Sequence, residues 1–430
     1  MKGLHDVDSF KVLEKHEEIE FSFQNTVGSD TSSLTDNEHL SFCDFQQGEI
    51  ANCGLVSALA SLSQRPEFST EIAPTIRRTS ESAELHFKMF CEGEPIKVKT
   101  DGLLPFDEDN RLMYSRSARN NKSYLAALLE KAYVKQVCNK SYSNAVATDP
   151  IMVFSSFSNS MISFEKWESW VPKWDVPDLL KHELHNQSSV TMSVHPPFGV
   201  DAGEEVEWAH SYSVMDYDEE NEAVKLYEPK CIPDCCASSA KLPLSLTASV
   251  DPSKGELLVT FDQLKGRSVH ICSLHAKHMY KSFFQSKLKV KPTDLNQSTL
   301  KASYVYKVKI EETSTFMINL FSYSNILESV NIEVTTASND DSSVEIDYEL
   351  YSMYKDICLL QNKGEITEAY NERFKLRPNT YFFSFELEMT KNIEKEISFL
   401  LKLSSVSKCT FEESNNGDKN CLQELEKLEI

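Results

Sequence analysis

Residues 47–62 read Gln47-Gly48-Glu49-Ile50-Ala51-Asn52-Cys53-Gly54-Leu55-Val56-Ser57-Ala58-Leu59-Ala60-Ser61-Leu62. A lone cysteine, Cys53, opens a segment of good helix formers, and Asn52 before it is a preferred N-cap residue type. No proline follows before Pro66, so we expect a helix from Cys53 to about Ser63. The unpaired N–H groups and the positive dipole end of such a helix stabilise a thiolate, which is the reactive form of cysteine.

Gln47 precedes this cysteine by six residues. Its side-chain amide could fold back beside the sulfur and donate a hydrogen bond to the oxyanion that forms during acyl transfer. The alternative is a structural cysteine, because a free cysteine among Leu, Val and Ala often fills space in a core. This segment alone does not decide between the two.

A second motif supplies a base for the thiol. Trp208–Asp216 is expected to be a strand that carries His210, and Ala223–Tyr227 the returning strand, with a polar turn between them. Glu228 ends the second strand. A Cys–His pair needs such a third group, because it fixes the imidazole tautomer and stabilises the charged ring. The candidate catalytic residues are Cys53, His210, Glu228 and, for the oxyanion, Gln47.

Both motifs resemble the calpain family of cysteine proteases. Residues 47–62 are similar to its pattern of Gln-Gly, four residues, Cys and a helical run ending Ala-Ser-Leu, and His210–Val214 is similar to its His-Ala-Tyr-Ser-Val. Other matches follow in family order at Asp101–Pro105, Ser115–Ser117, Leu128–Lys135, Tyr142 and Gly255–Leu264. The resemblance implies an α+β fold with a papain-like core of two subdomains and an active site in the cleft between them.

The chain changes character after about Lys287, where short alternating strands follow one another at even intervals. The expected strands are Tyr304–Ile310, Thr315–Phe321, Val330–Thr335, Val344–Tyr351, Thr380–Leu387 and Ile397–Leu403. This spacing favours an antiparallel β-sandwich, which resembles the sandwich that follows the calpain core. No segment has the spacing of an EF-hand loop, so the resemblance does not include the penta-EF-hand region.

The length of 430 residues suggests more than one domain. We predict five parts: an N-terminal extension (1–40), a Cys-bearing, mainly helical subdomain (41–145), a His-bearing, β-rich subdomain (146–286), the sandwich (287–408) and an acidic tail (409–430). A second helix is expected over Ser123–Val137 and an amphipathic one over Val176–His185. Further strands of the His-bearing part are expected at Val190–His195, Glu256–Phe261 and Val269–Leu274.

Charge and cysteine content narrow the partners and the compartment. The net charge of −22 argues against nucleic acid or an anionic membrane surface as the main partner, because both would repel the chain. The 11 cysteines are odd in number and irregularly spaced, which fits a reducing compartment better than a disulfide framework. Residues 1–8 lack the apolar core of a signal peptide, and no apolar run is long enough to be a transmembrane segment. We therefore expect a cytoplasmic protein.

Three residues, Glu228, Lys230 and Gly54, depart from the family pattern. Calpains have Asn-Pro-Trp after the His strand, where Asn orients the His and Trp shields it, whereas this chain has Glu228-Pro229-Lys230. A glutamate can still accept from the imidazole, but Lys230 gives no such cover and could draw the carboxylate away. Gly54 stands where the family has Trp, so an aromatic wall of the cleft is expected to be missing.

The sequence thus predicts a calpain-like cysteine endopeptidase that performs limited proteolysis of intracellular proteins, with a sandwich that binds a protein partner or regulatory surface. One alternative is a catalytically impaired homologue that acts as a scaffold. Another is a papain-like core that transfers acyl groups of small molecules. No cofactor is required; calcium is left open, because calpain cores bind it partly through backbone oxygens. A zinc site is disfavoured by its spacing; it would use Cys231, Cys235, Cys236, Cys272, His275 and His278.

Overall fold

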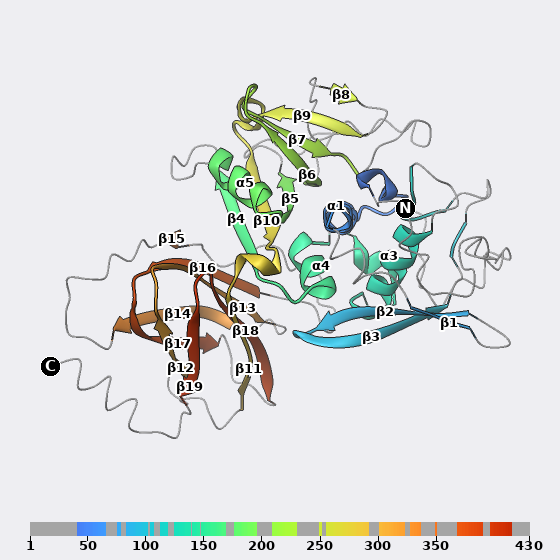
Figure 1. The fold of residues 1–430 in the computed structure, drawn as a ribbon. Helices are drawn as coiled ribbons and strands as arrows, with labels where there is room; N and C mark the ends of the chain where they lie inside the picture. The colour runs from blue at the N-terminus through green and yellow to red at the C-terminus, as the bar shows by residue number, and fades with distance from the viewer. Residues whose placement is uncertain are drawn as a thin grey trace. The chain divides into compact units, whose positions relative to one another are not determined.

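The computed structural model covers all 430 residues. It describes residues 41–65, 75–78, 83–101, 104–106, 112–118, 124–138, 140–146, 148–168, 176–195, 209–229, 249–251, 255–291, 301–322, 327–336, 349–350, 368–389 and 396–414. The chain divides into two compact units, Met1–Ala276 and Lys277–Ile430 (Figure 1).

Helix α1 (Cys53–Ser63) is buried within the first unit along its whole length after the first residue. Its neighbours are η3 (Phe42–Asp44), α3 (Leu125–Gln136), α4 (Pro150–Phe157), β5 (Ser189–Val194) and β6 (His210–Asp218). A helix that is enclosed on all sides lacks a charged face, and this run contains only apolar and small residues. The helices predicted over Cys53–Ser63 and Ser123–Val137 are confirmed as α1 and α3.

A seven-stranded sheet of order β4-β10-β5-β6-β7-β9-β8 follows in the first unit. All of its neighbouring strands are antiparallel. The remaining strands are β4 (Ile162–Glu168), β7 (Ala223–Tyr227), β8 (Ser249–Asp251), β9 (Glu256–Thr260) and β10 (Ser268–Leu274). The strands predicted for the His-bearing part are confirmed as β5, β6, β7, β9 and β10, as far as the described residues reach.

The two faces of this sheet pack against different helices, α1 and α5 (Val176–His185) (Figure 1). Tyr212 of β6 lies in one apolar cluster with Leu180 of α5. Ser213 comes next in the strand and so points to the opposite face, where its hydroxyl bonds the backbone of α1. The amphipathic helix predicted over Val176–His185 is confirmed.

The Cys-bearing part, predicted to be mainly helical over 41–145, also contains strands that were not predicted. Strands β1 (Thr75–Arg78), β2 (Ala83–Cys91) and β3 (Glu94–Asp101) form an antiparallel sheet in this range. In β2 the buried residues Leu85, Phe87 and Met89 recur at every second position, which is the period of a strand with one buried face. Polar residues between them complete this alternation, but the helical segments on either side dominate this part of the sequence.

The structure adds some elements and leaves some predictions untested. Helix α4 and strand β4 had no counterpart in the predictions, and short 3-10 helices lie at η4 (Tyr142–Ala145), η6 (Phe261–Leu264) and η7 (Lys277–Met279). Predictions outside the described residues concern 1–40, Trp208, Lys230, Cys231, Cys235, Cys236 and 415–430. Within the described ranges, no helix has the length and hydropathy of a membrane-spanning segment.

The second unit is a β-sandwich of two antiparallel sheets, ordered β11-β18-β13-β16-β15 and β14-β17-β12-β19. The strands are β11 (Ser282–Val290), β12 (Lys301–Ile310), β13 (Ser314–Ser322), β14 (Leu327–Thr336), β15 (Glu349–Leu350), β16 (Glu368–Leu376), β17 (Asn379–Met389), β18 (Ile397–Ser405) and β19 (Cys409–Ser414). All six predicted strands have counterparts, although only Glu349–Leu350 of the one at Val344–Tyr351 is described. β11, β16 and β19 are additional, and β19 shows that the sandwich includes residues expected in the acidic tail.

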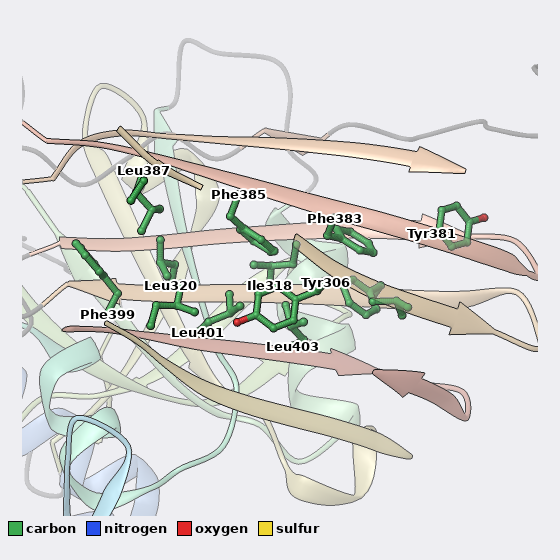
Figure 2. Close-up of a cluster of buried hydrophobic side chains, with 14 of the residues drawn as sticks. Tyr306, Ile318, Leu320, Tyr381, Phe383, Phe385, Leu387, Phe399, Leu401 and Leu403 are labelled. Carbon is green, nitrogen blue, oxygen red and sulfur yellow. The ribbon is translucent and has the colours of Figure 1, made fainter. Parts of the chain in front are cut away.

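Aromatic and aliphatic side chains from both sheets fill the space between them (Figure 2). Phe316 of β13 stacks on Phe383 of β17 with ring centroids 4.8 Å apart, which joins one sheet to the other. Leu401 and Leu403 of β18 lie in the same cluster as Phe385 of β17. This shared core explains why the strands alternate apolar and polar residues.

Replacing Phe383 by Ala should destabilise the sandwich strongly. The side chain is fully buried, so its loss leaves a cavity, and we expect the free energy of unfolding to fall by about 3–5 kcal/mol. Urea unfolding measures the change. Phe283→Ala is the matched control, because Phe283 is 45% exposed and its loss should cost about 1 kcal/mol or less. Equal losses for the two variants would contradict the assigned core.

Candidate active site

Three hydrogen bonds anchor helix α1 to strands β5 and β6. The Ser213 hydroxyl of β6 donates to the Ser57 carbonyl at 2.7 Å. One turn further along the helix, the Ser61 hydroxyl donates to the Val190 carbonyl at 3.1 Å, and the Ser61 carbonyl accepts from the Ser189 hydroxyl at 3.3 Å. Because these bonds fix the helix along the strands, the first residue of α1 meets the first residue of β6.

These two residues are Cys53 and His210, and their side chains form a hydrogen bond. The Cys53 sulfur also accepts the backbone N–H of Ser211. Burial acts to raise the pKa of the thiol, but the imidazole and the Ser211 N–H outweigh it, so the pKa lies below its ordinary value of 9.0. The thiol therefore ionises more readily than that of an ordinary cysteine.

Glu228 holds the other side of the imidazole. Nε2 of His210 lies 2.6 Å from Oε1 of Glu228, and both side chains are buried. Burial acts to lower the pKa of His210, whereas the carboxylate of Glu228 and the sulfur of Cys53 raise it, to about 10. Since Nε2 is engaged with Glu228, Nδ1 is the ring nitrogen that remains for the sulfur.

Gln47 belongs to a loop that touches both motifs. Its backbone N–H donates to the Pro229 carbonyl at 2.8 Å, and its Nε2 donates to the Ile50 carbonyl at 2.6 Å. The same carbonyl accepts the Asn52 N–H at 2.9 Å, which closes the loop just before α1. An amide nitrogen carries two hydrogens and Ile50 engages one of them, so the orientation of Nε2 is fixed while a second donor hydrogen stays on it.

A second buried carboxylate, Glu130 of α3, escapes sequence reasoning. Its Oε1 accepts from Nδ2 of Asn52 at 2.5 Å, and its Oε2 accepts from the Ser115 N–H at 2.8 Å. Burial raises the pKa of Glu130 to about 7, although the bonds from Ser115 and Asn52 act to lower it. Asn52 is the N-cap residue of α1, but its side-chain oxygen makes no capping bond, and its Nδ2 donates to Glu130. Glu130 therefore braces the loop that leads into Cys53.

A family model described as calpain family cysteine protease matches residues 14–229, about half of the chain. The chain belongs to the calpain family of cysteine proteases. Calpain-8 of Rattus norvegicus is 26% identical over 184 residues, which are 41% of this chain and 25% of that protein. The Calpain-2 catalytic subunit of Mus musculus is 27% identical over 183 residues, with the same two shares of 41% and 25%. The match thus spans about a quarter of the length of these calpains.

The calpain Trp has no room at position 54 of this chain. A Cβ atom on Gly54 would overlap the carbonyl oxygen of Thr148 and would lie 3.2 Å from Cδ of Pro150, at the start of α4. The backbone before α4 therefore fills the space next to the cysteine. Gly48 of the calpain-like Gln-Gly pair is constrained in the same way, because a Cβ there would overlap the backbone carbonyl oxygens of residues 113 and 114.

The zinc alternative gains no support from the part of the chain that the structure describes. There, no three side chains of the His, Cys, Asp or Glu type lie close enough together to hold a metal ion. Cys272 and His275, which the sequence offered as ligands, are both buried. His275 instead lies 3.2 Å from the carboxylate of Glu183.

Glu130→Gln should change how stability depends on pH. The pKa of Glu130 is raised from 4.5 to about 7 in the folded chain, so its stabilising contribution is full below about pH 4.5 and is lost as pH rises through 7. Gln does not ionise, so the variant should lose less stability than the parent over this range, by about 1.4 kcal/mol per unit of pKa difference.

Urea unfolding at pH 5 and pH 7.5 tests this expectation. Glu219→Gln is the matched control, because Glu219 is exposed in the turn after β6. Its pH dependence should follow that of the parent chain. If Glu130→Gln also follows the parent, the buried carboxylate does not titrate as its surroundings require.

Proposed function

We propose that this calpain-family chain is a cysteine endopeptidase in which Cys53 is the nucleophile, His210 carries the proton and Glu228 orients His210. The observation that carries the proposal is the hydrogen bond between the Cys53 thiol and the His210 imidazole. Oε1 of Glu228 lies 2.6 Å from the other ring nitrogen, Nε2. A lowered thiol pKa and a raised imidazole pKa favour a thiolate–imidazolium pair. In this proposal α1 and the seven-stranded sheet belong to the two subdomains of a papain-like core, about 41–145 and 146–286.

The proposed reaction has two stages. The Cys53 thiolate attacks the carbonyl carbon of a peptide bond, and His210 gives its proton to the amide nitrogen as the C–N bond breaks. The amine product leaves, and the acyl group stays on the sulfur as a thioester. His210 then takes a proton from water, the resulting hydroxyl attacks the thioester, and the acid product leaves as the thiolate–imidazolium pair forms again.

Both stages pass through an oxyanion that needs hydrogen-bond donors. The proposed donors are the second hydrogen of Gln47 Nε2 and the backbone N–H of Cys53. The bond from Nε2 to the Ile50 carbonyl supports this role, because it holds the amide in one orientation before substrate arrives. A preorganised donor of this kind contributes about 10²–10³ to kcat in other acyl-transfer enzymes.

The charge of Glu228 favours a second candidate function, a calpain homologue that binds proteins and turns over slowly or not at all. The calpain Asn is neutral, whereas Glu228 helps to raise the pKa of His210 to about 10. So basic an imidazole keeps the thiolate paired but gives its proton to the leaving amine less readily. Loss of turnover with retained binding would make the chain a scaffold.

We propose intracellular proteins as the substrates, cut at few sites, and the sandwich as a surface for a protein partner. Two observations support this reading. Some of the relatives are named as catalytic subunits of calpains. The described cysteines are free thiols, which suits a reducing compartment such as the cytoplasm. An alternative small-molecule acyl transfer has no comparable support.

Cys53→Ala and Cys53→Ser should reduce cleavage of a fluorescent casein substrate to background, because the sulfur forms the bond to the acyl group. The assay is run with and without calcium. Cys91→Ser is the matched control, since Cys91 is another free cysteine at the end of β2 and should be dispensable. Cleavage that survives in both Cys53 variants rules out the assignment. No labelling of Cys53 by a thiol-directed epoxide at any calcium concentration favours the scaffold.

Glu228→Gln should lower the pKa of His210, because the carboxylate is the largest cause that raises it. The rate of Cys53 alkylation by iodoacetamide should rise in two steps with pH, and the second step marks deprotonation of His210. We expect this step near pH 10 in the parent chain and at least about one pH unit lower in the variant. Glu220→Gln, in the exposed turn, is the control. An unmoved second step would show that Glu228 does not govern the ring.

A further inference from the structure

A row of polar side chains crosses the seven-stranded sheet beside the catalytic pair. The register pairs Ser211 of β6 with Ser193 of β5, Ser193 with His270 of β10, and His270 with Lys166 of β4. Residues that are directly opposite in antiparallel strands point to the same face of a sheet. These four residues, together with His195 two positions after Ser193, are called the polar row.

Side-chain contacts join four members of the row in two pairs. The Ser193 and Ser211 hydroxyl oxygens lie 2.6 Å apart, and Nε2 of His195 lies 3.0 Å from Nδ1 of His270. Nε2 of His270 lies 3.3 Å from the hydroxyl of Ser268. The row therefore carries hydroxyl, imidazole and ammonium groups, and none of its five members is acidic in a chain whose net charge is −22.

The row starts at the reacting sulfur and runs away from helix α1. The backbone N–H of Ser211 donates to Cys53, so the first member of the row lies against the thiolate. From Cys53, helix α1 extends along the same face of the sheet. There the hydroxyls of Ser213 and Ser189 donate to the carbonyls of Ser57 and Ser61. The helix thus covers the sheet behind the row, while Ser193 and His195 are partly exposed and Lys166 is exposed.

The hydrogen bonds of His195 and His270 allow one ring N–H to serve as a donor for an anion. Burial and then the charge of Lys166 lower the pKa of His195, and burial, His195 and Lys166 lower that of His270 to about 3, so both rings are neutral at pH 7. In one arrangement, the Ser268 hydroxyl donates to Nε2 of His270, and Nδ1–H of His270 donates to Nε2 of His195. The proton of His195 then lies on Nδ1, which is a donor for an anion. Lys166 supplies the positive charge next to it.

We propose that the polar row is a subsite for an acidic side chain of the substrate, Asp or Glu, with its carboxylate between Lys166 and Nδ1 of His195. This inference rests on the proposed function, because it places the subsite on a peptide held at Cys53. Strands are about 4.8 Å apart, so His270 lies about 10 Å from Ser211, and an extended peptide covers that distance in about three residues. The acidic residue therefore lies two or three residues from the bond that is cut.

Binding to the Cys53→Ala variant tests the subsite without turnover. Fluorescent peptides that differ only by Glu or Gln, placed two or three residues before or after the central bond, are compared by fluorescence anisotropy. One Glu peptide should bind about tenfold more tightly than its Gln partner, as a charge-assisted hydrogen bond allows. Adding Lys166→Gln or His195→Gln should remove the preference, because each change weakens binding of the Glu peptide more than binding of its Gln partner.

Lys181→Gln is the matched control, because Lys181 lies on α5, which packs on the opposite face of the sheet. It should keep the preference for Glu. Equal affinities for every Glu and Gln pair, including no measurable binding of either, would overturn the subsite. A preference for Glu in a chain whose parent cleaves none of these peptides would instead overturn the endopeptidase proposal and leave the subsite standing.

Discussion

The docking of helix α1 on strands β5 and β6 is the contact on which the geometry of the candidate site depends. Its hydrogen bonds run between serine hydroxyls and backbone carbonyls in a buried interface, where an unmade bond costs about 1–3 kcal/mol. A slip of the helix along the sheet would break all of them together. The interface therefore has one favourable position, and in that position the thiol meets the imidazole.

Much of the fold could be predicted from the sequence because its strongest patterns are local. Helix α1 follows from a run of helix formers, and β6 and β7 follow from two apolar segments around a polar turn. The sheet of β1, β2 and β3 was missed although apolar and polar residues alternate in β2, because the helical patterns of α1 and α3 dominate this part of the sequence. Elements α4 and β4 were also missed; both are short, although Asp149 and Pro150 mark the start of α4 with an N-cap and a first-turn proline.

The candidate site divides in the same way. Gln47, Cys53, His210 and Glu228 stand in two recognisable motifs, and the structure brings the last three into one hydrogen-bonded set. Glu130 could not be found, because its partner Asn52 is 78 positions away and a lone Glu in a helix is usually exposed. Lys230, which also departs from the calpain pattern, lies outside the described residues.

The backbone of Thr148 lies so close to Gly54 that it limits which residues can replace this glycine. An aromatic side chain does not fit at position 54 while the Thr148 carbonyl occupies that space. Moving that carbonyl means moving the start of α4, where Asp149 caps the helix and Pro150 fixes its first turn. A single substitution therefore cannot place the family tryptophan at position 54. The residues before α4 would have to change together with it.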